Sequence, residues 1–370
     1  MEQVNQKTYF HHLDATRFIG FLHVFTAHCF FTTNPAVAQS GFYQFFQYNI
    51  RAGFLGLDYF FVLSSFLLTW IILEERKISG HFKAIYFLIR RALRLWPSYF
   101  LIILCTYSAV SLAQNWHIQA PILPPIEVFL LFHANYFFIS HGQDYLYLLV
   151  FLWVISVEEQ FYFFWAFAMK YLSNYFHLLI AALIIISVFF RYSYSQQESN
   201  LWFNTLSVVG NFALGAWAAW LVFYNNRFKA FVQQLPKWGI SMGYLIYFPI
   251  VYFYFSWANN PLGIAFEKLI FSFLFVFIIL EQCFAHNSLF KLGKFKSINY
   301  LGRISLGLYC YHGVVITFYR KWVESMQFNQ TDIQVFIINP IAILAITLLV
   351  AVLSYELFEK HVYKLRMRFY

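Results

Sequence analysis

The sequence predicts an all-α integral membrane protein, a bundle of about ten transmembrane helices with both termini in the cytoplasm. Only 11% of the 370 residues are charged and 61% are hydrophobic, whereas a soluble domain carries about 25% charged residues. Apolar runs of about 20 residues, the length that crosses a bilayer, recur along the chain. The net charge of +9 is explained by the basic residues that membrane proteins carry in their cytoplasmic loops. The sequence has no block of basic residues interleaved with exposed aromatics that would indicate nucleic-acid binding.

Ten apolar segments are long enough to span the membrane. They occupy residues 11–32, 53–73, 95–114, 145–169, 174–191, 201–224, 238–256, 262–284, 299–319 and 335–357. The run at 126–139 is too short to cross, and we expect it at the surface or as a re-entrant segment. With ten spans, the basic connections near residues 76–94, 227–237, 291–296 and 360–368 share one side with the N-terminus. Lys and Arg accumulate on the cytoplasmic side, so that side is the cytoplasm.

No connection is long enough to bury a core, so residues 1–370 are expected to form a single transmembrane domain. The first apolar run is too long for a cleavable signal peptide and is expected to stay as a helix. The four cysteines are scattered singly at positions 29, 105, 283 and 310, which predicts neither a disulfide framework nor a zinc site. Motifs for a Walker-type phosphate loop and a zinc-binding helix do not occur in the sequence, and no nucleophile elbow is expected.

The first apolar segment carries Asp14, Arg17, His23 and His28 where lipid should exclude charge. Such residues in a spanning helix are costly and by default mark a functional site. Arg17 and His28 are eleven positions apart, or three helical turns, so both are expected on one face and about 16 Å apart along the axis. The topology puts Arg17 near the inner end and His28 near the outer end. The alternative is a snorkelling helix-end arginine and a satisfied core histidine.

Three acidic residues lie inside later spans. Asp58 lies about two turns into the second span, at the depth of His28, and is predicted to pair with that imidazole and to fix its tautomer for general-base chemistry. The alternative is that Asp58 pairs elsewhere. Glu158 and Glu159 lie near mid-membrane in the fourth span and point about 100° apart, so we expect them to serve different partners, functional or structural.

A basic cluster lies close to the second connection. Arg90 and Arg94 are i,i+4 neighbours with Arg91 beside them, and guanidinium groups bind phosphate bidentately. The cluster therefore suits a multiply phosphorylated ligand, although topology alone also places basic residues there. Two glutamates near the end of the last span, at positions 356 and 359, are expected to form ion pairs with these arginines. In the ninth span, Tyr309 and His312 lie within one helical turn.

Five stretches resemble, in order, motifs of the acyltransferase-3 family of membrane O-acyltransferases, typified by bacterial O-antigen acetylases. LDATR followed by His28 is similar to the family's LDGLR with its R-x10-H spacing, and GFLGLDYFFVLSSFLL is similar to GxxGVDxFFVLSGFLI. RRALRLWPSY resembles RRxLRIxPxY, SVEEQFYFFW resembles SVEEQFYLxWP, and SLGLYCYH resembles SYxLYLxH. Ser65 stands where the family usually has Gly, and Ala15 and Thr16 replace Gly-Leu. The hydrolase-like domain that some members append is not expected here.

The resemblance implies an O-acetyltransferase that moves an acyl group, commonly acetyl, from cytoplasmic acyl-CoA to a hydroxyl of a surface or lipid-linked carbohydrate. The acceptor is expected at the outer face of a bacterial cytoplasmic (inner) membrane. Acyl-CoA is then a donor substrate, and neither a permanently bound cofactor nor a metal is expected. The residues expected in catalysis are His28 as base, Arg17, Asp58 and Glu158. Those expected to bind the donor are Arg90, Arg91, Arg94 and Arg17. The further candidates are Asp14, Glu159, Tyr162, Tyr309 and His312.

Two mechanisms and two other functional classes stay open. His28 either acts as general base in a direct transfer, which we favour, or accepts the acyl group first and passes it on. A transporter of lipid-linked saccharides without acyl transfer would also use buried Arg, His and Glu. A structural membrane subunit explains the hydrophobicity but not the ordered motifs. The acceptor, the acyl chain and the oligomeric state are not decided by the sequence.

Overall fold

A computed structural model describes residues 8–116, 122–142 and 147–369 of the chain. In these ranges every regular element is a helix and no strand occurs, which confirms the predicted all-α integral membrane class. By its contacts the chain divides into two compact units. Unit 1 comprises Met1–Gly20, Leu55–Ala84 and Phe163–Arg303, and unit 2 comprises Phe21–Phe54, Ile85–Tyr162 and Ile304–Tyr370. The single domain over residues 1–370 stays a prediction.

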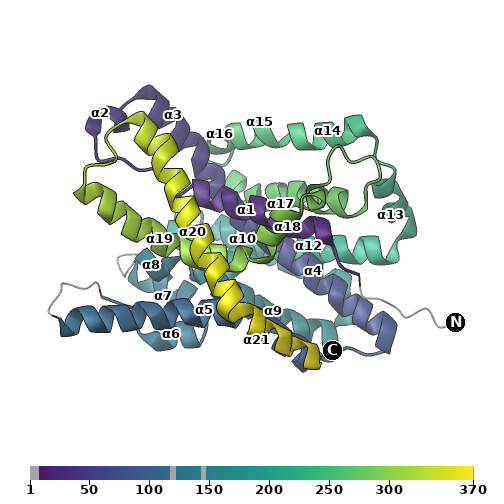
Figure 1. The fold of residues 1–370 in the computed structure, drawn as a ribbon. Helices are drawn as coiled ribbons and strands as arrows, with labels where there is room; N and C mark the ends of the chain where they lie inside the picture. Colours follow the sequence, from purple (N-terminus) through teal and green to yellow (C-terminus); the bar gives the residue numbers. More distant parts are fainter. Residues whose placement is uncertain (1–7, 117–121, 143–146, 370) are drawn as a thin grey trace. The chain divides into compact units, whose positions relative to one another are not determined.

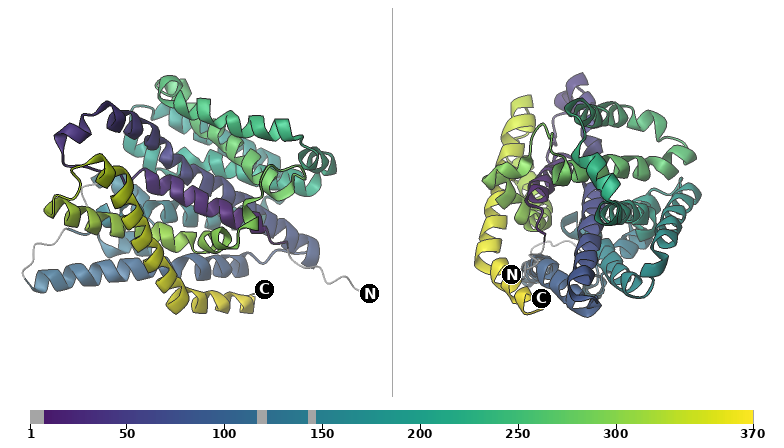
Figure 2. Two further views of the ribbon diagram at one scale, coloured as in Figure 1. Left: turned by 45° about the horizontal axis from the view of Figure 1, so that its top comes forward. Right: turned by 90° about the vertical axis from the view of Figure 1, so that its right-hand side faces the viewer.

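Unit 1 is built around the paired helices α4 (Leu55–Ser79) and α12 (Thr205–Tyr224). The helices α10 (Phe176–Ser193) and α17 (Pro261–Phe284) pack against α12 (Figure 2). The α12 stretch GNFALGAWAA is rich in small residues, which let helix backbones approach closely in lipid. At Gly215 a Cβ atom would lie 2.1 Å from the backbone oxygen of Val62, so any larger residue would push α12 away from α4.

Unit 2 combines one very long helix with a packed pair. The long helix is α5 (Ala84–Asn115), which continues through Pro97. The pair is α19 (Ser305–Ser325) and α20 (Asn339–Ser354), which lie side by side (Figure 1). Single π-helical turns flank α20 at Gln334–Ile338 and Tyr355–Glu359, and such turns often accompany functional sites.

The helix α1 (His11–Thr26) begins in unit 1 and ends in unit 2, and α9 (Trp153–Tyr171) begins in unit 2 and ends in unit 1. The shorter helices are α2 (Pro35–Ala38), α3 (Gly41–Ile50), α6 (Ile126–Leu130), α7 (Ala134–His141), α8 (Tyr147–Val150), α11 (Glu198–Phe203), α13 (Asn226–Gln233), α14 (Lys237–Leu245), α15 (Tyr247–Tyr252), α16 (Tyr254–Trp257), α18 (Lys296–Arg303) and α21 (Lys360–Leu365). Single 3₁₀ turns lie at Arg51–Phe54, Ser173–Tyr175, Leu292–Lys294 and Arg366–Phe369.

Among the described residues, six helical stretches are long and apolar enough to cross a membrane. They are Gly41–Ser79, Ala84–Asn115, Ser173–Ser193, Glu198–Tyr224, Pro261–Phe284 and Gln334–Phe369. The other four predicted spans are also largely helical. However, α1 has only 16 residues, residues 237–257 are broken into three short helices, and α9 and α19 carry several charged residues. The count of ten spans and the cytoplasmic termini stay predictions.

The short apolar run at residues 126–139 folds into α6 and α7, with a break between them. Phe132 has a φ of 54°, which turns the chain sharply between the two helices. Phe129, Phe138 and Asn135 have no exposed surface, and the Gln160 amide donates to the Asn135 side-chain oxygen over 2.9 Å. One face of this segment is therefore buried in unit 2, whereas Leu130 and Leu131 are exposed. Both alternatives, a position at the surface and re-entry into the membrane, stay predictions.

Candidate active site

The first half of α1 holds a buried ion pair in unit 1. Arg17 donates to the Asp14 carboxylate over 2.5 Å, and the Tyr9 hydroxyl also donates to this carboxylate. A Cβ at Gly302 would lie only 1.6 Å from the Asp14 carbonyl oxygen, so α18 can approach α1 only at a glycine. Asp14 is 2% exposed. The two sequence candidates are thus partners of each other, because an unpaired charge at this depth would be costly.

The helix α1 ends before His28. Its last residue is Thr26, whose hydroxyl donates to the His23 carbonyl over 2.8 Å. The N–H groups of Ala27 and His28 then donate to carbonyls three residues earlier, as in the tightened last turn of a helix. The predicted helix over 11–32 is therefore too long, and the predicted three-turn stripe from Arg17 to His28 does not form as one α-helical face. His28 lies in the turn that follows the helix.

The imidazole of His28 lies beside that of His312 in unit 2, with ring centroids 5.9 Å apart. Aromatic rings surround the pair: Phe54 is 5.3 Å from His28, and Phe151 and Phe21 are 5.2 Å and 5.9 Å from His312. His28 is half-buried, whereas His312 is 1% exposed. One imidazole is therefore accessible and the other is enclosed behind it.

The tautomer of His312 follows from its backbone partner. Its Nδ1 lies 2.5 Å from the carbonyl oxygen of Tyr309, and because a carbonyl only accepts, Nδ1 carries the hydrogen. In the neutral ring Nε2 then keeps its lone pair. The Tyr309 hydroxyl in turn donates to the Phe151 carbonyl over 2.8 Å. Tyr309 thus holds both the His312 imidazole and the loop that carries Phe151. The helix α8, which precedes this loop, packs against α19 (Figure 1).

Asp58 pairs with partners in unit 1. Its carboxylate accepts from the Lys268 ammonium over 2.8 Å and from the Asn211 amide over 2.8 Å. Lys268 lies 5.6 Å from the centre of the Trp202 ring. The predicted pairing of Asp58 with the His28 imidazole is therefore wrong. The alternative, that Asp58 pairs with another residue, is confirmed. A lysine attracts a carboxylate more strongly than a neutral imidazole does, because both partners carry a full charge.

The SVEEQFY stretch places three candidate side chains, Glu158, Glu159 and Tyr162, on α9 in unit 2. Glu158 and Tyr162 are 8% and 4% exposed, so both point into the protein. The Glu159 Oε1 atom is buried without a hydrogen-bond partner among the described residues, and the Trp96 and Arg91 side chains lie near its carboxyl group. That the adjacent glutamates serve different partners stays a prediction.

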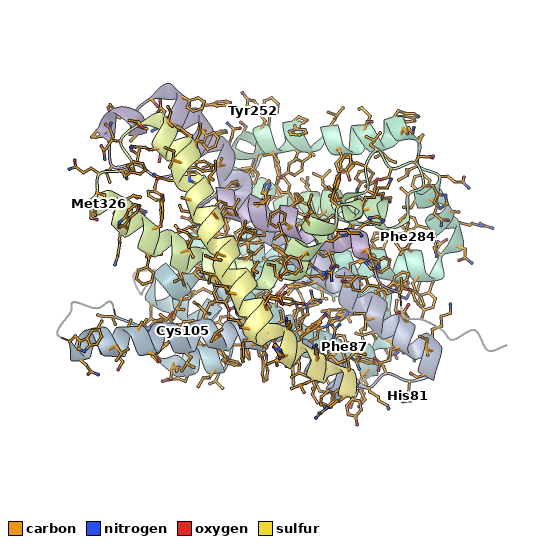
Figure 3. All side chains as sticks on the ribbon, in the orientation of Figure 1. His81, Phe87, Cys105, Tyr252, Phe284 and Met326 are labelled. Carbon is orange, nitrogen blue, oxygen red and sulfur yellow. The ribbon has the colours of Figure 1, made fainter. Side chains whose placement is uncertain are left out.

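The arginine cluster lies in the first half of α5, near the C-terminal segment of unit 2. Arg90 donates to the carbonyl of Phe369 over 2.6 Å, and the Arg91 guanidinium lies 5.5 Å from the ring centre of Phe87, which Figure 3 labels. Of the two late glutamates expected to pair with these arginines, Glu356 forms an ion pair with Lys360, four residues further along the chain.

The second late glutamate, Glu359, is held by hydroxyl groups. It accepts from Ser354 over 2.7 Å and from Tyr311 over 3.4 Å. A hydroxyl partner satisfies a buried carboxylate without a second charge, so the arginines of α5 are not needed for this purpose. The prediction that Glu359 forms an ion pair with these arginines is therefore wrong. A role for Arg90, Arg91 and Arg94 in binding a ligand stays a prediction.

The sequence did not single out Gly313, Phe151, Lys268 or Asn211. Gly313 follows His312 directly, and a Cβ there would lie 2.0 Å from the Phe151 ring. A glycine beside a candidate histidine is a signal that sequence reasoning could have used. Lys268 and Asn211 carry no comparable signal, because they lie 210 and 153 residues from Asp58.

Gly313→Ala is expected to lower catalytic turnover by displacing the Phe151 ring from His312. Overpacking of this kind costs about 1–3 kcal/mol in stability, and a shift of about 1 Å at a catalytic group can cost about 100-fold in rate. The measurement is acyl transfer together with thermal unfolding. Gly41→Ala is the control, because nothing lies within 4 Å of a Cβ at that position. Unchanged transfer in Gly313→Ala would show that Phe151 does not position the imidazole pair.

Comparison with known proteins identifies the family. A family model described as "Acyltransferase domain" matches residues 10–356. The O-acetyltransferase OatA of Staphylococcus aureus (strain NCTC 8325 / PS 47) is 26% identical over 335 residues, which cover 85% of this chain and 53% of OatA. The provisionally named O-acetyltransferase SACOL0978 of S. aureus (strain COL) is 24% identical over 327 residues, covering 84% of this chain and 52% of that protein.

The chain spans about half the length of the curated relatives that it matches. No solved structure gives a significant match. The family model covers the candidate residues on α1, α4, α5, α9 and α19, in the order in which the sequence motifs occur. This match confirms the family predicted from the five motifs. The chain is an integral membrane protein that belongs to the acyltransferase-3 family.

Proposed function

We propose that this chain is an O-acetyltransferase that moves an acetyl group from acetyl-CoA to a hydroxyl of a surface or lipid-linked carbohydrate. Membership of the acyltransferase family and the O-acetyltransferase names of its relatives support the reaction class. The observation that carries the proposal is the imidazole pair, in which half-buried His28 lies 5.9 Å from enclosed His312. An accessible imidazole surrounded by aromatic side chains is suited to proton transfer to and from a substrate.

In the proposed step, His28 removes the proton from the acceptor hydroxyl. The oxygen attacks the thioester carbonyl carbon, the carbon–sulfur bond breaks, and the proton passes from His28 to the leaving CoA thiolate. No oxidant or further reactant is needed. Arg17 does not serve as an acid, because a guanidinium stays protonated; its proposed role is to bind the donor or hold charge near Asp14. An acyl-histidine intermediate is the alternative, and label on His28 after incubation with acetyl-CoA alone would favour it.

The phosphates of acetyl-CoA are proposed to bind at Arg90, Arg91 and Arg94, on the side predicted to be cytoplasmic. Arg94→Gln is expected to raise KM for acetyl-CoA about tenfold or more, because a hydrogen bond to a charged group contributes about 1.5–3 kcal/mol. The measurement is transfer kinetics with acetyl-CoA and with acetyl-CoA that lacks its 3′-phosphate. Arg320→Gln, on α19, is the control. An unchanged KM for both donors would place the phosphates elsewhere.

Direct assay tests the reaction class. The full chain, purified in lipid nanodiscs, is incubated with acetyl-labelled acetyl-CoA and surface glycans from the bacterium that encodes it. We expect alkali-labile label in the glycan, with stoichiometric release of CoA thiol. If labelled glycan does not form while the protein moves lipid-linked saccharide across vesicles, the chain is a transporter. Sealed vesicles that contain the protein in either orientation then test whether the acetyl group passes from acetyl-CoA on the cytoplasmic side to the acceptor on the outer side, as proposed.

A further inference from the structure

Two loops of unit 2 are joined by side-chain hydrogen bonds just beyond His28. We call this feature the amide strap and define it as residues 32–34 together with residues 329 and 330. Thr32 donates to the Asn329 carbonyl over 2.6 Å, and Thr33 donates to the Asn329 side-chain oxygen over 2.8 Å. The Asn34 amide donates to the Gln330 carbonyl over 2.7 Å, and the Gln330 amide donates to the Thr33 hydroxyl over 2.8 Å.

The amide strap consists entirely of neutral hydroxyl and amide groups, and it contains no ionised side chain. This separates it from the polar clusters of the protein that are built on buried ion pairs, such as that of Asp58 and Lys268. Amides and hydroxyls both donate and accept hydrogen bonds. They therefore match a ligand that presents many hydroxyl groups and no charge, as an uncharged sugar does.

An exposed aromatic ring lies close to the strap along the chain. Trp322 is 51% exposed near the end of α19, four residues before Met326, which Figure 3 labels at the start of the loop that carries Asn329. Its ring lies 5.6 Å from that of Tyr319, whose hydroxyl donates to Asn339. Beside it, the exposed Arg320 pairs with Glu324 over 2.7 Å. The exposed indole offers an apolar face, and the strap offers hydrogen-bonding groups.

The strap keeps unused hydrogen-bonding capacity. Asn329 has no exposed surface, yet its Nδ2 atom has no partner among the described residues. A buried donor without an acceptor is unfavourable, so a ligand hydroxyl oxygen would be stabilised there once the strap opens to admit it. Thr33 is exposed and Gln330 half-buried, so the outer rim of the strap is accessible.

The strap also lies close to the proposed base. Thr32 follows His28 by four residues, so the two Cα atoms are at most about 14 Å apart, and both belong to unit 2. We propose that the amide strap, with Trp322, binds an uncharged sugar unit of the acceptor carbohydrate next to the hydroxyl that reacts at His28. The proposal rests on the proposed acetyl transfer and adds to it the chemical class of the acceptor and the place where it binds.

The test is steady-state transfer from acetyl-CoA to surface glycans of the encoding bacterium, with each substrate varied in turn. Thr33→Val and Trp322→Ala should each raise KM for the glycan about three- to tenfold, with kcat and KM for acetyl-CoA unchanged. Trp322→Tyr should restore KM, because it keeps an aromatic ring. Trp238→Ala, which removes an indole that is 73% exposed in unit 1, is the matched control and should leave KM unchanged.

The outcomes separate this inference from the proposed function. If the unaltered chain transfers no acetyl group, the proposed function fails. If it transfers acetyl but Thr33→Val and Trp322→Ala leave KM for the glycan unchanged, the strap only joins the two loops and the inference is wrong. The inference is also wrong if both variants lower thermal stability and kcat together without changing KM for the glycan.

Discussion

His28→Ala should abolish measurable acetyl transfer while leaving the protein folded. General-base catalysis contributes about 10²- to 10⁴-fold. The adjacent Phe54 ring carries no basic nitrogen, and His312 is enclosed at 1% exposure. The assay measures labelled glycan and released CoA thiol with the full chain in nanodiscs. Thermal unfolding of the same preparation shows whether the fold survives.

His23→Ala is the matched control for this experiment. His23 lies five residues before His28, on α1 itself, and its Nε2 contacts the carbonyl of Ala52 over 3.0 Å. We expect transfer within a few fold of the unaltered chain. Full activity in His28→Ala would remove His28 from the chemistry, and equal losses in both variants would indicate that α1 acts only through folding.

Arg191→Ala is expected to destabilise unit 1 by about 3–5 kcal/mol, the cost of breaking a buried ion pair. Arg191 of α10 is 1% exposed and binds the Glu267 carboxylate of α17. It also donates to the Ser207 hydroxyl over 2.6 Å and to the Ile264 carbonyl over 2.8 Å. Removing the guanidinium leaves the Glu267 charge without its cation. The measurement is thermal or denaturant-induced unfolding in a fixed detergent.

Two variants calibrate this result. Arg191→Met with Glu267→Leu removes both charges and should recover most of the loss, because an apolar pair of similar volume carries no desolvation penalty. Arg320→Ala breaks an ion pair with Glu324 whose side chains are 57% and 33% exposed, and it should change stability by at most about 1 kcal/mol. Equal stability of Arg191→Ala and the unaltered chain would mean that the ion pair does not hold α10 to α17.

The fold class and the family followed from local features of the sequence. Long apolar runs predict membrane helices because lipid cannot satisfy exposed backbone groups, and some helices lie close to the predicted ranges, for example Pro261–Phe284 for the span at 262–284. The spacing between Arg17 and His28 in the first motif also predicts His28 as a catalytic residue without knowledge of its neighbours in space. Each of these features depends on residues near one another in the chain.

The partners of the charged groups depended on the tertiary structure. Asp58 finds Lys268, 210 residues away, and His28 lies beside His312, because helix packing and not sequence distance decides which buried charges meet. The end of α1 at Thr26 could not be predicted from the sequence either. The Thr26 hydroxyl donates to the His23 carbonyl, and such a bond competes with continuation of the helix. By itself, the sequence determined a membrane protein of the acyltransferase-3 family with an imidazole near the end of its first helix. The tertiary structure decided what surrounds that imidazole, because burial in lipid or protein forces every polar group to find a partner in space.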